Sequence, residues 1–67
     1  MIPVTSSLLK AIGYDAFTQE LQVDFHTGIA YIYSGVSVET FNAMVESNSV
    51  GSFFIRQIKG KFEARKV

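Results

Sequence analysis

Hydrophobic and polar residues alternate along the first half of the chain with the two-residue period of a β-strand. The cleanest alternation lies in residues 20–25, where three apolar side chains share one face and polar side chains share the other. Residues 7–15 and 29–34 are two further strand candidates, and the second is rich in β-branched and aromatic residues. Short turns at 15–19 and 26–28 separate the three segments. The first half therefore predicts a three-stranded antiparallel meander.

The second half changes to a helical period. Ser37 is placed to cap a first helix. The apolar stripe of this helix has four members, Val38, Phe41, Met44 and Val45. The polar segment 46–52 interrupts the pattern, and either Ser49 or Ser52 can cap a second helix that ends at Gly60. The tail, 61–67, adds only Phe62 to the core. The predicted fold class is α+β, with the three-stranded meander followed by two short C-terminal helices packed on one face, in one domain over residues 1–67.

The loop between the second and third strands decides which face of the sheet carries Tyr31 and Tyr33. A two-residue turn at Thr27-Gly28 would place both on the polar face, whereas a three-residue loop starting at His26 places both on the core face. The two-residue turn needs positive φ at both central residues, and the β-branched Thr27 resists this. The sequence therefore favours the three-residue loop, in which the rings pack against the core and the hydroxyls reach its rim.

Composition indicates the number of domains, the tendency to self-associate and the cellular location. A chain of 67 residues forms one small domain, and without cysteine it has no disulfide or thiolate metal site to stabilise it. Hydrophobic residues make up 48%, which is high for so small a monomer and predicts self-association, most simply as a dimer. The chain has no apolar run long enough to span a membrane and no signal-peptide pattern, so we expect a cytoplasmic protein.

Charge is balanced overall but divided along the chain. Residues 56–67 carry five of the six basic residues and one acidic residue, while residues 1–55 carry the other five acidic residues. A basic tail on an acidic body could contact an anionic partner. The alternative is a solvated helix end, because basic residues also favour helix C-termini.

Three segments together resemble a known family, the KTSC domain. They are "VTSSLLKAIGYD" (4–15), "LQVDFHTGIAYIYSGV" (21–36) and "NSVGSFFIRQIKG" (48–60). The most recognisable parts are Ser6-Ser7, Ile12-Gly13-Tyr14-Asp15, the Tyr31-x-Tyr33 pair, and Ser49-x-Gly51 followed by Phe53. The family occurs at the C-terminus of some lysyl-tRNA synthetases and as stand-alone bacterial and phage proteins.

The resemblance implies a small α+β domain without an established activity, for which RNA binding has been suggested. This chain departs from the usual pattern at Ser37, where a proline often stands, and at Ile55, where a polar residue is common. The change at Ile55 weakens any site that needs that polar group. Ser6-Ser7 and Tyr14-Asp15 could form a polar pocket at one end of the sheet, but we favour a structural role in strand and turn formation, with a bulge at Gly13. Gly51 is expected at a tight corner between helices.

Catalytic chemistry is difficult to build from these residues. His26 is the only histidine, it lies in a predicted turn, and the serines read as turn or cap residues. No ligand spacing for a metal and no glycine-rich phosphate loop is present. We therefore expect no enzyme activity, no cofactor and no metal.

Two binding functions remain. The first is an interaction module that binds a protein partner or a second copy of itself, with apolar contacts from Ile29, Ile32 and Ile55. The alternative is weak binding of single-stranded RNA, in which aromatic rings stack on bases and basic residues hold the backbone. Its stacking candidates are Tyr14, Tyr31 and Tyr33, and its phosphate-binding candidates are Arg56, Lys59, Lys61, Arg65 and Lys66.

Overall fold

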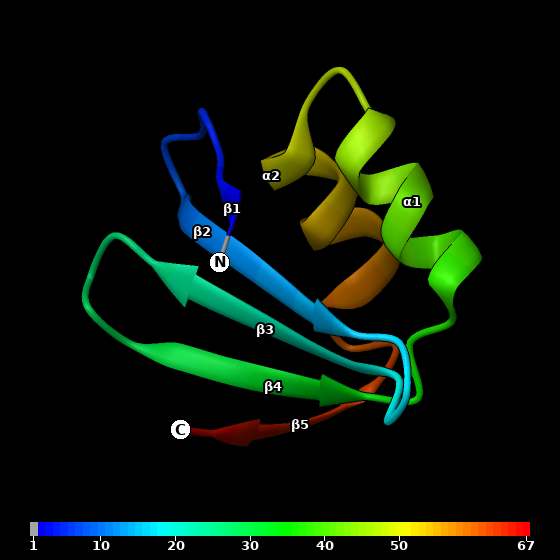
Figure 1. Cartoon of the computed structure of the whole chain (residues 1–67). Coiled ribbons are helices and arrows are strands. Elements are labelled where there is room, and N and C mark those ends of the chain that lie inside the picture. The colour runs from blue at the N-terminus through cyan, green and yellow to red at the C-terminus, as the bar shows by residue number, and fades with distance from the viewer. Residues whose placement is uncertain (1) are drawn as a thin grey trace.

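The computed structural model describes residues 2–67 as one antiparallel sheet with a helical layer on one face (Figure 1). The strands are β1 (Ile2–Pro3), β2 (Leu9–Asp15), β3 (Glu20–Phe25), β4 (Ala30–Ser34) and β5 (Glu63–Lys66), and they lie side by side in that order. The helices, between β4 and β5, are α1 (Val38–Glu46), α2 (Val50–Phe53) and a π-helical turn, η1 (Phe54–Ile58). The predicted α+β class is confirmed.

The sheet has five strands, so the prediction of a three-stranded meander was wrong in the number of strands. The tail expected to contribute only Phe62 forms β5, which also means that the helices are not the C-terminal elements. Both added strands lie at sheet edges, and every residue of β1 and β5 is exposed. An edge strand held mainly by backbone hydrogen bonds needs no apolar alternation, so the pattern that reveals the three inner strands is missing there.

The loop between β3 and β4 has three residues, as the sequence favours. Gly28 has a φ of +90°, and its N–H donates to the Phe25 carbonyl at 3.0 Å. The Phe25 N–H in turn donates to the Ile29 carbonyl at 2.9 Å, which closes the hairpin. This register places Tyr31 opposite Val23 and Tyr33 opposite Leu21, on the face that the helices cover.

The irregularity in β2 lies at its start. The pairing with β3 shifts between Leu9 and Ala11, which marks a bulge at Lys10 and corrects the expected bulge at Gly13. Ser6 precedes the strand, and its Oγ accepts hydrogen bonds from the Leu8 and Leu9 N–H groups. The Ser6 side chain thus stabilises the bend at residues 7–8 that leads into β2.

Serine caps fix where both helices begin. Ser37 Oγ accepts from the Thr40 N–H at 3.2 Å at the start of α1, as predicted. Ser49 Oγ accepts from the Ser52 N–H at 3.2 Å at the start of α2, which decides between the two candidate caps in favour of Ser49. In residues 2–67 no helix combines the length and apolar character needed to cross a bilayer.

The core lies between the sheet and the helices. Its buried members are Leu9, Ile12, Leu21, Val23, Tyr33, Val36, Met44, Phe54 and Ile58. Phe62 packs against this cluster, as predicted. In the predicted stripe of α1 only Met44 is fully buried, while Val38 and Val45 are 41% and 43% exposed. The helix therefore contacts the sheet along a narrower face than its sequence indicates.

Candidate binding groove

An apolar hollow opens between the sheet and η1, at the end where β4 begins. It measures about 450 Å³, and we call it the aromatic groove. Its lining residues are Leu8, Phe25, Thr27, Ile29, Tyr31, Tyr33, Phe54, Ile55 and Lys59. The volume is within the range of small-molecule and side-chain binding sites, which are mostly apolar with a few polar groups.

Four aromatic rings form the wall and floor of the groove. Phe54 lies edge-to-face with Phe25 and with Tyr33, with ring centroids 5.5 Å apart in both pairs. Tyr31 meets Phe25 edge-on at 6.1 Å and lies 6.4 Å from Tyr33. These contacts hold the rings in fixed orientations, so the groove is formed before any ligand arrives.

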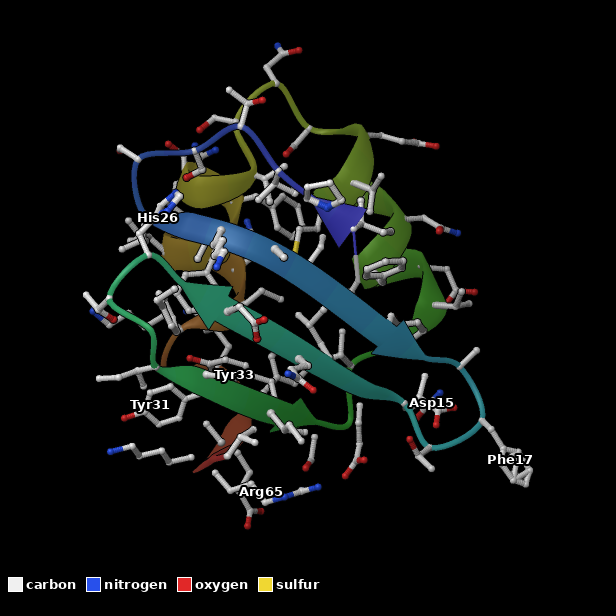
Figure 2. The ribbon with its side chains drawn as sticks, turned by 60° about the vertical axis from the view of Figure 1, so that its left-hand side comes forward. Asp15, Phe17, His26, Tyr31, Tyr33 and Arg65 are labelled. Carbon is white, nitrogen blue, oxygen red and sulfur yellow. The ribbon has the colours of Figure 1, made fainter. Side chains whose placement is uncertain are left out.

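The two tyrosines differ in how much of each ring is available. Tyr33 is 6% exposed and belongs to the core, whereas Tyr31 is only partly buried and lies at the groove surface. Figure 2 shows both on β4, with Tyr31 nearer the start of the strand. Burial raises the pKa of the Tyr33 hydroxyl above its ordinary value, and the neighbouring Tyr31 adds to that shift.

Two of the three isoleucines predicted as an apolar surface meet at this groove. Ile29 and Ile55 both line it and are 40% and 53% exposed. Ile32 lies opposite Gln22 on β3, on the sheet face that the helices leave open. The structure therefore separates Ile32 from the other two, because neighbouring positions on a strand point to opposite faces.

The five basic residues predicted to bind phosphate lie in different parts of the structure. Lys59 lines the groove, and Lys66 is directly opposite Tyr31 across β4 and β5, which places it on the same face. Arg65 lies on the open face, where its Nη2 donates to Glu20 Oε2 at 2.9 Å. The last two candidates are exposed elsewhere: Arg56 lines a separate polar hollow beside Ser49 and Ser52, and Lys61 follows η1.

Tyr14 lies away from the groove. Its ring stacks on Phe41 of α1, with centroids 4.6 Å apart and planes 9° from parallel, and its hydroxyl donates to the Val36 carbonyl. Desolvation raises the pKa of Tyr14, and the charges of Glu39 and Asp15 raise it further. A ring already stacked inside the molecule has one face fewer to offer a base.

The two polar motifs of the sequence do not form a common pocket. Ser6 precedes β2, where its backbone carbonyl lies 2.8 Å from the exposed His26 Nε2. Asp15 ends β2, where its Oδ1 accepts from the Phe17 and Thr18 N–H groups and shapes the turn. His26, which Ser6 contacts, and Asp15 lie at opposite ends of β2 (Figure 2), which supports the structural interpretation of both motifs.

Four of the nine lining residues are not among the site residues predicted from the sequence, namely Leu8, Phe25, Thr27 and Phe54. Their contribution depends on the three-residue loop and on the packing of η1 against β4. Ile29 and Ile55 could be found because both are large apolar residues, Ile29 at the start of a predicted strand and Ile55 within the second predicted helix.

The fold is a small α+β domain with an apolar groove between the sheet and η1. A model of the KTSC domain family matches residues 5–62, and the chain belongs to this family. A solved KTSC domain protein of Yersinia pestis is 39% identical and superposes with a TM-score of 0.91, over 97% of this chain and 92% of that one.

Two further relatives carry names that state no activity. A protein of Tsukamurella paurometabola is 38% identical over 64 residues, which cover 96% of each chain. An uncharacterized protein of Stutzerimonas stutzeri is 36% identical over 58 residues, which cover 87% of this chain and 82% of that one. The matches thus cover most of the length of both relatives.

Proposed function

We propose that this KTSC domain is a non-catalytic, cytoplasmic interaction module whose aromatic groove binds an apolar side chain of a partner protein. The observation that carries the proposal is the pair of isoleucines, Ile29 and Ile55, which stay 40% and 53% exposed at the rim of a preformed aromatic site. Exposed apolar side chains gathered around a hollow are typical of protein-binding surfaces.

The charge at the groove indicates the kind of partner. Lys59 is the one formally charged side chain among the described lining residues, and Lys66 lies on the same face. A partner segment that presents a phenylalanine, leucine or isoleucine beside an aspartate or glutamate would match both the apolar lining and the ammonium groups. We therefore propose an acidic, apolar peptide segment as the occupant.

The lining favours binding over catalysis. Among the described lining residues the groove contains no carboxylate and no imidazole, the groups that most often act as general acid and base. Within residues 2–67, acidic residues and histidine do not gather in a group able to hold a metal ion. The chain also contains no cysteine, which is in keeping with a reducing compartment.

The test is a selection of displayed random peptides against the immobilised domain. We expect the selected peptides to combine an apolar residue with an acidic one and to lose binding to Ile55→Glu, which places a carboxylate at the rim where it repels the acidic residue. The matched control is Val38→Glu, because Val38 is also an exposed apolar residue but lies outside the groove. Peptides that bind all three proteins equally would contradict the proposal.

Single-stranded RNA is a second candidate occupant, favoured by one specific observation. Tyr31 is partly exposed, with Lys66 directly opposite it and Lys59 in the same groove, so one stacking ring and two ammonium groups share a surface. Fluorescence anisotropy of a labelled oligonucleotide at two salt concentrations tests this. Binding that weakens with salt and disappears in Lys59→Glu would make RNA the first candidate.

A further inference from the structure

The outer edge of β5 has no neighbouring strand among the described residues, because β5 is the last strand in the sheet order (Figure 1). The N–H group of Val67, just beyond β5, donates to the Ala30 carbonyl at 3.0 Å. In an antiparallel ladder the backbone groups of successive residues point alternately toward the partner strand and away from it. Residues 63 and 65 therefore point their backbone groups toward β4, and Ala64 and Lys66 point theirs outward.

The charges of β5 are self-complementary about its centre. When two identical strands pair antiparallel in one sheet, a two-fold axis runs through the pairing and residues directly opposite share a face. With the axis at Ala64, Glu63 of each copy lies opposite Arg65 of the other, and the two Ala64 residues exchange their outward N–H and C=O groups. Glu63 and Arg65 both lie on the open face, so the contact would contain two opposite-charge pairs.

The neighbouring registers are disfavoured by the same charges. Centring the pairing at Glu63 would place two carboxylates opposite each other, and centring it at Arg65 would place two guanidinium groups opposite each other. Like charges directly opposite in a sheet are destabilising. The Glu–Arg pairs at the Ala64 register would also occupy non-hydrogen-bonded positions, where opposing side chains approach most closely.

We propose that two copies of this domain pair through β5, centred at Ala64, into one continuous sheet. The proposal rests on the function proposed above, an interaction module, but it uses a different surface from the aromatic groove. Arg65 can keep its bond to Glu20 while it binds Glu63 of the second copy, because a guanidinium group has five N–H donors.

The contact is expected to be reversible. A strand of four residues, three of them charged, gives a small interface. Short edge strands with charged side chains also limit pairing with unrelated strands. Specificity then comes from the charge pattern, and the dimer forms as protein concentration rises.

The test is sedimentation equilibrium from about 10 µM to about 1 mM protein, a range that covers weak association. The wild-type mass should rise from 7.4 kDa toward twice that value. Glu63→Arg alone and Arg65→Glu alone should each remain monomeric, because each places like charges opposite each other. An equimolar mixture of the two variants should associate again, since the altered strands are complementary to one another.

Two further variants separate strand pairing from other effects. Ala64→Pro removes only an outward N–H, so it should keep the circular dichroism spectrum of the fold and lose the dimer. Lys10→Glu, a charge change on β2 away from this edge, should leave the dimer intact. Ile55→Glu should also dimerise normally, and Ala64→Pro should still bind groove-selected peptides, so each proposal can fail alone. A wild type that stays at 7.4 kDa throughout, or a mixture of variants that stays monomeric, would overturn the pairing.

Discussion

Gly51 of α2 and Ser6 before β2 approach so closely that a methyl group would not fit between them. A β-carbon built on Gly51 would come 2.7 Å from Ser6 Oγ. That oxygen is already held in place, because it accepts the Leu8 and Leu9 N–H groups at 3.1 and 3.2 Å. The contact brings α2 against the start of β2. Gly51 was expected at a tight corner between helices, but it lies at a close contact between the helical layer and the sheet.

Gly51→Ala should therefore destabilise the domain by about 1–3 kcal/mol, the usual cost of overpacking. Urea denaturation followed by circular dichroism measures this loss. Ser6→Ala removes the oxygen that clashes and leaves the β-carbons of residues 6 and 8, at 3.8 and 4.0 Å from the added methyl group, which are ordinary van der Waals distances. The double variant should then lose less stability than the sum of the two single variants, and strict additivity would contradict the explanation.

Tyr14→Phe should cost about 1 kcal/mol, because it deletes the hydrogen bond from the hydroxyl to the Val36 carbonyl and keeps the stack on Phe41. Tyr31→Phe is the matched control, since its hydroxyl makes no hydrogen bond to the residues that the structure describes. Equal unfolding midpoints for the two variants would show that the Tyr14 bond adds nothing.

The raised pKa values of Tyr14 and Tyr33 predict a loss of stability at alkaline pH. Both phenols are neutral in the folded and unfolded states below the ordinary tyrosine value of 10.0. Above it, the unfolded chain releases these protons before the folded chain does, so stability falls as pH rises. Unfolding midpoints measured from pH 8 upward should decline less steeply in Tyr14→Phe and Tyr33→Phe than in the wild type. Identical slopes in all three proteins would show that these two tyrosines do not cause the loss of stability at alkaline pH.

Gly28→Ala tests the loop that orients the tyrosines. Gly28 has a φ of +90° and no atom within 4 Å of the position a β-carbon would take, so the substitution strains only the backbone. We expect a loss of about 1 kcal/mol or more in the free energy of unfolding. Gly28→Asn should lose less, because asparagine tolerates positive φ better than alanine does.

The inner sheet could be predicted because local rules decide it. Thr27 disfavours a two-residue turn and Gly28 permits a three-residue loop, and the loop sets the faces of Tyr31 and Tyr33. Ser37 likewise locates the start of α1, whereas the sequence leaves the start of α2 open between Ser49 and Ser52. In each case one residue type meets a backbone requirement that few others can meet.

The edges of the sheet and the full outline of the groove could not be predicted in this way. Glu63–Lys66 has no apolar periodicity, and it joins β4 through backbone groups that every sequence possesses. The groove depends on how η1 approaches β4, which places Phe54 against Tyr33 and leaves Ile55 at the rim. Packing of this kind depends on tertiary distances, and the spacing of residues along the chain does not specify them.

The order of the strands also sets an order of folding events. The four strands from β1 to β4 are neighbours along the chain, whereas β5 reaches β4 only across residues 35–62. Closing so long a segment costs more conformational entropy than closing a hairpin, so β4 gains its second neighbour late. Until then its outer edge, with the aromatic side chains of "AYIYS", is free to pair with other chains. The last strand to form is thus the one that protects the folding chain from aggregation.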